Sequence, residues 1–152
     1  MSTEIERKFL VDGKPWGESV GTHFSQGYLN RDKERTVRVR ICGDRAFLTV
    51  KGLTTGATRS EFEYEIPVPD ARELLKLADG PVVEKRRHLI THNNATWEVD
   101  EFLGENAGLV VAEIELESED DPFARPPWLG REVTGDPRYF NSNLAAHPYA
   151  AW

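Results

Sequence analysis

Apolar and polar residues alternate with a period of two along most of this chain, and the helical period of 3.6 is rare. A period of two is typical of β-strands, because successive side chains of a strand point to opposite faces of its sheet. Two dipeptides with the composition of tight turns, Gly43-Asp44 and Asn93-Asn94, predict hairpins. The alternation predicts eight strands, over residues 4–11, 23–29, 35–42, 46–51, 59–66, 82–91, 96–102 and 109–117.

One segment has the spacing of a helix instead. Its apolar residues fall at i, i+3, i+4 and i+7, at Ala71, Leu74, Leu75 and Ala78. Asp70 is the predicted N-cap, with Glu73 in the capping-box position, and Gly80 is the predicted stop.

The tail after Glu117 is irregular, because four prolines interrupt it. We expect one short helix to begin near Pro122 and another to span Asn141–Ala146. The aromatic residues of the tail are expected to anchor it by packing, at Phe123, Trp128, Tyr139 and Phe140. Since no repeat or long linker divides the chain, we expect a single domain over residues 1–152.

Sorting the strands by parity separates charged residues from apolar ones. In the first strand, Glu4, Glu6 and Lys8 share one face, and Ile5 and Phe9 share the other. Charged and apolar residues are divided between the two faces in the same way in the third, fourth, fifth and eighth predicted strands. In the sixth, both faces carry charges, so parity does not indicate which face is buried. The ordinary interpretation is a barrel or sandwich with an apolar core and its charged face in water.

An inverted barrel explains the charges better. An ordinary solvated face mixes Ser, Thr, Gln and Lys, but this one consists almost throughout of Glu, Arg and Lys grouped by sign. Glu4 with Glu6, and Glu113 with Glu115, are like-charged pairs about 6.5 Å apart along a strand, and at an effective dielectric of about 20 each pair repels by about 2.5 kcal/mol. A confined site with such pairs needs cations. We therefore predict a mainly β (α+β) protein built on a closed eight-stranded antiparallel barrel, with a charged interior, room for one small ligand and a few flanking helices.

The predicted lining is balanced in charge. Seven cations are expected to face the interior: Lys8, Arg38, Arg40, Lys51, Arg59, Lys85 and Arg87. Seven anions are expected to face it too: Glu4, Glu6, Glu61, Glu63, Asp100, Glu113 and Glu115. Carboxylate oxygens suit a hard divalent cation such as Mg²⁺ or Mn²⁺, and arginine grips phosphate oxygens bidentately. Such a lining favours a metal–polyphosphate complex over either ion alone.

An outward apolar face has to be covered, and one helix cannot cover eight strands. We expect the aromatic tail to cover part of it and a second copy of the chain to cover more, in a homodimer. The net charge of −7 and the pI of about 5.1 argue against binding of bulk nucleic acid or acidic membranes. One cysteine excludes a disulfide framework. Without a signal-peptide core or a spanning apolar run, we expect a cytoplasmic protein.

The order of the charged motifs resembles that of a known family. Glu4-x-Glu6-x-Lys8 at the N-terminus is similar to the signature of the CYTH superfamily, the triphosphate tunnel metalloenzymes. The family's remaining charged motifs have counterparts in the same order, at Arg38–Arg40, Lys51, Arg59–Glu63, Lys85–Arg87, Asp100 and Glu113–Glu115. The likeness runs from residue 4 to about residue 146 and is greatest to short bacterial members, some of which are inorganic tripolyphosphatases.

The resemblance implies roles for these residues. It implies metal-binding carboxylates at Glu4, Glu6, Glu113 and Glu115. It implies a second acidic group, which orients basic residues or holds a second metal, at Asp100, Glu61 and Glu63. It implies triphosphate clamps at Lys8, Arg38, Arg40, Lys51, Lys85 and Arg87. Arg59 is either a further clamp or the partner of an interior glutamate. Ordinary solvent-facing or ion-paired charges are expected at Glu65, Glu98, Arg86 and Glu117.

The leading hypothesis is metal-dependent hydrolysis of a linear triphosphate, foremost inorganic tripolyphosphate to pyrophosphate and phosphate. The attacking water would be activated by a second metal or by Lys85, whose pKa the neighbouring Arg86 and Arg87 would lower. The alternatives are a class IV-type adenylate cyclase, a thiamine or nucleoside triphosphatase, and a polyphosphate-binding module without catalysis. Nucleic-acid binding through Arg31–Arg40 is disfavoured by the acidity of the chain.

Overall fold

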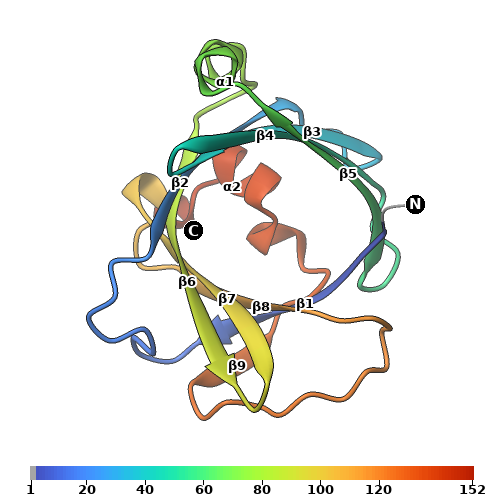
Figure 1. The fold of residues 1–152 in the computed structure, drawn as a ribbon, viewed down its shortest axis with the longest axis vertical. Coiled ribbons are helices and arrows are strands. Elements are labelled where there is room, and N and C mark those ends of the chain that lie inside the picture. Colours follow the sequence, from blue (N-terminus) through green and yellow to red (C-terminus); the bar gives the residue numbers. More distant parts are fainter. Residues whose placement is uncertain (1–2) are drawn as a thin grey trace.

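Eight antiparallel strands form a closed ring in the computed structural model, which describes residues 3–152 (Figure 1). They follow the chain as β1 (Thr3–Val11), β2 (Thr22–Asn30), β3 (Arg35–Cys42), β4 (Arg45–Gly52), β5 (Thr58–Ile66), β6 (Val83–His92), β7 (Ala95–Phe102) and β8 (Val110–Glu115). Neighbours in the ring run β5-β4-β3-β2-β6-β7-β8-β1, and pairing of β1 with β5 closes it. The predicted barrel is therefore confirmed.

The structure adds a strand that the sequence did not suggest. Strand β9 (Leu129–Glu132) pairs with the end of β1, opposite Phe9 and Val11. Asn93 and Asn94 both have positive φ, at 48° and 67°, as the predicted tight turn between β6 and β7 requires.

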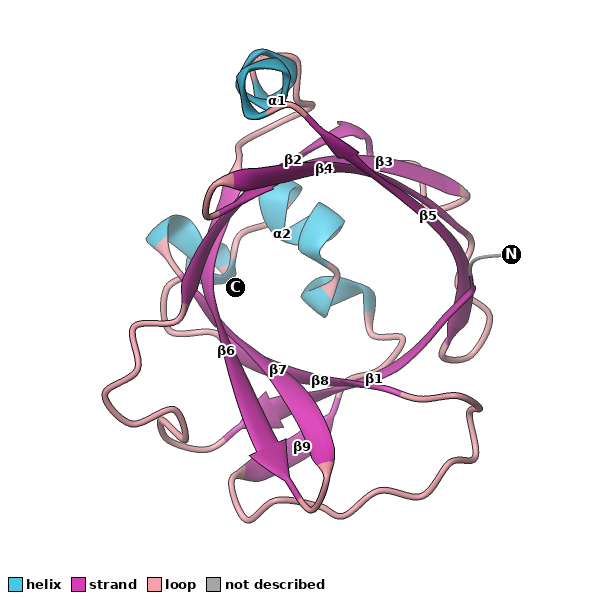
Figure 2. Cartoon of the chain, in the orientation of Figure 1, coloured by secondary structure: helices cyan, strands magenta, loops and turns pink. Residues whose placement is uncertain are grey.

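The helices are few and short (Figure 2). The described chain has helix α1 (Val68–Leu75) and helix α2 (Asn141–Ala146). It also has three single-turn 3-10 helices, at Gly104–Asn106, Pro137–Tyr139 and Tyr149–Ala151. Helix α2 matches its prediction. Within residues 3–152, none of the helices is long and apolar enough to cross a membrane.

Helix α1 departs from its prediction at both ends. It begins at Val68, with Pro67 as N-cap, because Pro69 fits a first helical turn whose N–H groups have no helical acceptor. Asp70 therefore lies in the first turn and caps nothing through its side chain. The helix ends at Leu75, before Gly80, and no helix forms near Pro122.

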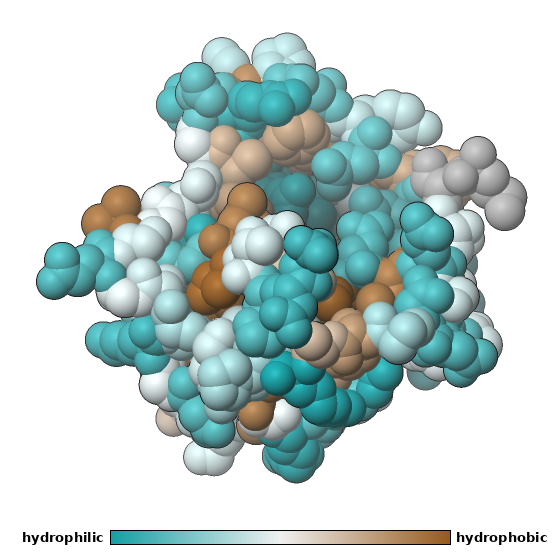
Figure 3. All heavy atoms as spheres, turned by 60° about the horizontal axis from the view of Figure 1, so that its bottom comes forward, coloured by the Kyte–Doolittle hydropathy of each residue, from teal (hydrophilic) through white to brown (hydrophobic). Residues whose placement is uncertain are grey.

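Two apolar clusters cover the outside of the barrel. Helix α1 packs on β2, β3 and β4 through a cluster around Val39, Ala46 and Ala71. The tail covers the outer face of β1, β7 and β8, where Phe123 and Trp128 pack around Phe9 and Trp97. The apolar atoms on the face in Figure 3 are correspondingly confined to separated patches.

The third cluster lies inside the ring. Val83, Phe102 and Val111 have the inward parity of Lys85, Asp100 and Glu113, and they pack against Tyr139 and Leu144 of the tail. Figure 1 shows α2 within the outline of the ring. The prediction of a charged interior is thus confirmed along most of the barrel but is wrong at this end. There the tail enters the barrel as an apolar plug, which we define as residues 133–145.

Candidate active site

A polar cavity of about 270 Å³ occupies the rest of the barrel. Seven cations line it, at Lys8, Arg38, Arg40, Lys51, Arg59, Lys85 and Arg87. Seven anions line it, at Glu4, Glu6, Glu61, Glu63, Glu98, Glu113 and Glu115. The structure therefore brings together every residue of the predicted lining except Asp100, which is buried behind the wall, and Glu98 takes its place.

Asp100 on β7 binds two cations of β6 at once. Its carboxylate accepts from Arg87 Nε at 2.8 Å and Nη2 at 2.9 Å, and Lys85 Nζ lies 2.7 Å from Oδ2. Burial alone would raise the pKa of Asp100, but Arg87 and Lys85 hold it below its usual value. Both oxygens are thus engaged by cations, so Asp100 orients basic side chains as it stands.

Burial, assisted by the charge of Arg87, lowers the pKa of Lys85 to about 8 against the opposing effect of Asp100. The predicted lowering of this pKa by neighbouring cations is confirmed for Arg87 and is wrong for Arg86. Arg86 lies on the other face of β6, where its guanidinium donates to the backbone oxygen of Val20.

Arg40 is poorly compensated. Within residues 3–152 its Nε is buried without a hydrogen-bond partner, and its nearest carboxylate is Glu63, at 3.6 Å. Burial, together with repulsion from Arg38 and Arg87, lowers the pKa of Arg40 to about 10. The face of Phe24 supports two of these guanidinium groups, with the Cζ atoms of Arg40 and Arg87 at 4.9 and 4.8 Å from its ring centroid.

The same glutamate serves Arg38, whose Nη2 lies 3.7 Å from Glu63 Oε2. Arg38 also has a buried Nε for which the described part of the chain offers no hydrogen-bond partner. One carboxylate thus faces two guanidinium groups, with Arg87 close enough to repel one of them. This part of the cavity has the electrostatics of an anion site.

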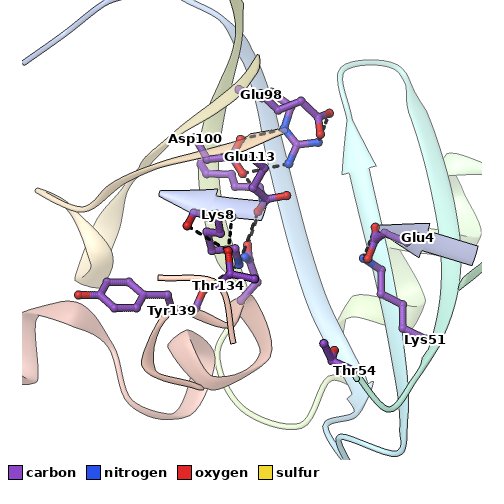
Figure 4. A network of polar contacts seen from close by, with 12 residues as sticks. Glu4, Lys8, Lys51, Thr54, Glu98, Asp100, Glu113, Thr134 and Tyr139 are labelled. Atoms are coloured by element: carbon purple, nitrogen blue, oxygen red, sulfur yellow. Dashed lines mark hydrogen bonds and ion pairs between the residues drawn. The ribbon is translucent and has the colours of Figure 1, made fainter. Parts of the chain in front are cut away.

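The carboxylates gather on β1 and the strands beside it. Lys51 Nζ lies 3.0 Å from both oxygens of Glu4, and Arg59 Nε lies 3.6 Å from Glu4 Oε1. The alternative that Arg59 pairs with an interior glutamate therefore matches the geometry, although Arg59 also lines the cavity. Figure 4 shows Glu4 and Lys51 on one side of the cavity and the group around Glu113 on the other.

Glu6 and Glu113 form a like-charged pair next to Lys8. Burial and the charge of Glu113 raise the pKa of Glu6 well above its usual value. Burial also acts to raise the pKa of Glu113, but Lys8, with Nζ 3.5 Å away, holds it far below. In the absence of another cation, these opposite shifts favour Glu6 as the protonated member of the pair and Glu113 as the ionised one.

A divalent cation fits this pair, because hard carboxylate oxygens and uncompensated negative charge are what Mg²⁺ and Mn²⁺ require. The four predicted metal carboxylates line one cavity, but Glu115 is exposed at its edge. Among residues 3–152, no three Asp, Glu, His or Cys side chains already converge as a ligand set.

Several residues of the site escaped the sequence argument. Glu98 was expected to be an ordinary solvent-facing or ion-paired charge; it does pair with Arg87, at 2.9 Å, but it also lines the cavity. Its parity on β7, the same as that of Asp100, would have found it. The plug supplies Thr134, Asn141 and Ser142, for which the irregular tail gave no periodic signal.

Comparison with known proteins gives one family. The model of the CYTH domain matches residues 2–149. An inorganic triphosphatase of Acetivibrio thermocellus is 54% identical over 151 residues, covering 98% of this chain and 97% of the relative. An inorganic triphosphatase of Nitrosomonas europaea is 40% identical over 147 residues, covering 94% and 97%. A crystal structure of an inorganic triphosphatase superposes with a TM-score of 0.68 at 39% identity and covers 95% of each chain.

The raised pKa of Glu6 predicts a pH-dependent stability. In the unfolded chain Glu6 ionises near its usual value, so the folded state loses stability as pH rises from there through the higher folded value. Glu6→Gln, which does not titrate, should be more stable than the wild type in EDTA at pH 8, by on the order of 1 kcal/mol, and not at pH 4. Urea unfolding measures the difference.

Added Mg²⁺ should reverse this order, because the cation stabilises the wild type and finds one ligand fewer in the variant. Glu105→Gln, at an exposed position, is the matched control. A Glu6→Gln variant that is less stable than the wild type at pH 8 in EDTA would contradict the raised pKa of Glu6.

Proposed function

The chain belongs to the CYTH domain family, and we propose on that basis that it is a divalent-metal-dependent triphosphatase. The proposed substrate is inorganic tripolyphosphate, hydrolysed within the barrel to pyrophosphate and phosphate. The two relatives described above, both inorganic triphosphatases, support this choice of substrate.

The uncompensated cations around Arg40 carry the proposal. Arg38 and Arg40 share Glu63, and each has a buried Nε without a partner within the described part of the chain. Buried charge of one sign is costly unless it is paired. A phosphate chain provides that pairing, and guanidinium groups bind phosphate oxygens bidentately.

The size of the cavity favours an inorganic substrate. About 270 Å³ is slightly less than the roughly 300–1,000 Å³ of pockets that enclose drug-sized organic ligands. Cations are spread along the cavity from Lys51 near Glu4 to Arg87 near Asp100. This distribution suits several phosphates in a row, and phosphoryl transfer asks a protein mainly for positioning and charge neutralisation.

The metal belongs on the carboxylate side of the cavity. Glu6 and Glu113 are the proposed core of the site, with Glu4 and Glu115 completing it and Mg²⁺ or Mn²⁺ as the ion. When bound, the ion would neutralise charge on the phosphate oxygens and the leaving group. We propose the guanidinium groups of Arg38, Arg40 and Arg87 and the ammonium groups of Lys8 and Lys51 as the clamps that hold the phosphates. Glu61 and Glu63 orient basic residues in this scheme, as Asp100 does.

Lys85 is the proposed general base. Its Nζ is buried at the wall of the cavity, and a pKa of about 8 leaves a substantial share of free amine near neutral pH. Catalytic bases work best when their pKa lies near the operating pH.

A homodimer and a cytoplasmic location complete the proposal. The outer face of β5 exposes two aromatic side chains, Phe62 at 43% and Tyr64 at 60%, beside the apolar outer positions Val50 and Leu48 of β4. Exposed apolar patches of this kind mark interaction sites. A single free cysteine, Cys42, suits a reducing compartment.

An assay of the phosphorus products tests the function. Tripolyphosphate with Mg²⁺ or Mn²⁺ should give phosphate and pyrophosphate, and EDTA should abolish the reaction. Arg40→Gln should raise KM by about tenfold or more, because a charge-assisted phosphate contact is worth roughly 1.5–3 kcal/mol. Arg45→Gln, with its exposed side chain paired to Glu65, is the control and should leave KM unchanged.

Other outcomes of that assay select the rivals. Cyclic AMP from ATP would make the chain a cyclase, and turnover of thiamine triphosphate alone would make it a thiamine triphosphatase. Binding of tripolyphosphate without turnover would leave a polyphosphate-binding module.

The pH profile tests Lys85. If its free amine is the base, kcat/KM should rise with pH through about 8, since kcat/KM follows the pKa of the free enzyme. Lys85→Ala and Lys85→Arg should lower kcat by about 100-fold or more, because neither variant supplies a base. Wild-type turnover with an unchanged profile in Lys85→Ala would exclude the role.

Sedimentation velocity at micromolar concentration tests the dimer. We expect about twice the chain mass of 17.2 kDa, and a shift to the monomer in Tyr64→Lys. Leu77→Lys, at a position 71% exposed elsewhere on the surface, is the control. A wild type that sediments as a monomer contradicts the dimer.

A further inference from the structure

One amide oxygen links the plug to the proposed base. Asn141, the first residue of α2, accepts at Oδ1 from Lys85 Nζ at 3.0 Å and from Gln26 Nε2 at 2.9 Å. Gln26 on β2 is fully buried, and its Nε2 also contacts the Tyr28 hydroxyl at 3.3 Å. Three distant parts of the chain, β2, β6 and α2, therefore meet at Lys85.

The donor at Lys85 decides how both amides are oriented. An amine nitrogen that donates needs an acceptor, so Asn141 must turn Oδ1 toward Lys85. Because Oδ1 then also faces Gln26, Gln26 must present Nε2 to it. This orientation leaves Gln26 Oε1 buried without a partner in the described part of the chain. Such a group costs stability, which indicates that Gln26 is retained for its donor.

Asp100 and Asn141 together also fix the direction of the lone pair on Lys85 Nζ. A neutral amine has two N–H groups and one lone pair. Asp100 Oδ2 at 2.7 Å and Asn141 Oδ1 at 3.0 Å take both N–H groups. Since Lys85 lines the cavity, the position left for the lone pair is on the cavity side.

We propose that Asn141, held by Gln26, is a positioning residue that aims the Lys85 lone pair at the attacking water. This inference rests on Lys85 being the general base. In the step it serves, Nζ takes a proton from water as the water oxygen forms a bond to phosphorus. The bridging P–O bond breaks, and its electron pair leaves with the departing phosphate group. The new ammonium then loses its proton to the departing group or to solvent.

Several groups besides Asn141 face Lys85 and contribute to its titration. Asp100 of β7 and Glu113 of β8 favour the ammonium form, and Arg87 on the same strand opposes it. The rings of Phe24 and Phe102 lie at 5.8 and 5.6 Å from Nζ. Among the groups that face Lys85, Asn141 is neutral and polar. Replacing it by Asp introduces a negative charge while an acceptor oxygen remains at the same place.

Three variants test the proposal on tripolyphosphate with Mg²⁺, with urea unfolding to confirm that each is folded. Asn141→Leu removes the acceptor and should lower kcat by about tenfold or more with KM nearly unchanged, because misplaced catalytic groups lose rate rather than affinity. Gln26→Leu should act in the same direction and less strongly. Asn143→Ala is the control, since Asn143 lies on the same helix and its side-chain amide donates to Pro137 O rather than contacting Lys85.

Asn141→Asp separates positioning from mere support of the fold. It keeps an acceptor oxygen, so kcat at high pH should recover toward the wild type. Its negative charge favours the ammonium form of Lys85, so the rise of kcat/KM should move to higher pH. If Asn141 only held the plug in place, Asn141→Asp would not shift the pH at which kcat/KM rises. If Asn141→Leu does not fold, Asn141→Asp and Gln26→Leu still carry the test.

The proposal is overturned if Asn141→Leu or Asn141→Asp has the wild-type kcat and an unshifted pH profile of kcat/KM while Lys85→Ala is inactive. If Lys85→Ala itself keeps full activity, the base assignment has failed first, and the positioning role falls with it.

Discussion

Asp100 binds two cations inside a closed barrel, and the rest of the site depends on that contact. Moving an isolated charge out of water is costly, and several like charges in one cavity add their mutual repulsion. Asp100, itself 1% exposed, offsets this cost for Lys85 and Arg87 by bonding both directly. The carboxylate stands behind the wall, so it fixes the two cations without occupying space that a ligand needs. Among the described residues, Arg40 has no carboxylate nearer than Glu63, which lies 3.6 Å away and also serves Arg38. The charges of Lys85 and Arg87 are therefore compensated within the protein, whereas those of Arg38 and Arg40 favour a bound anion.

Much of the fold could be predicted, because it follows from alternation. Strand parity placed Lys8 with Glu4 and Glu6 inside and Phe9 outside, and the structure has them so. The same parity places Glu98 inside, although it was expected to be an ordinary solvent-facing or ion-paired charge because no motif singled it out. In β6, parity could not distinguish the two faces. Lys85 was singled out there by the family resemblance.

The tail could not be predicted in the same way. Prolines remove periodicity from it, so its contacts depend on tertiary packing rather than on local pattern. Its aromatic residues were expected outside the barrel; Phe123 and Trp128 are there, but Tyr139 lies within. Asn141 reaches the cavity for the same reason, and an isolated Asn in a short helix carries no signal of a role. The start of α1 was misjudged because Asp70 is a good N-cap residue, yet the prolines at 67 and 69 favour an earlier beginning.

The first strand has partners from three distant parts of the chain: β5, β8 and β9. Lys8 lies opposite Glu113, and Phe9 lies opposite Glu132, more than a hundred positions further along the chain. Contacts so distant in sequence slow folding, because the chain loses loop entropy before it gains the contact. During synthesis, β1 leaves the ribosome first and has no β8 to pair with until most of the chain has followed. The ring closes late, and the charges of the cavity remain in water until it does.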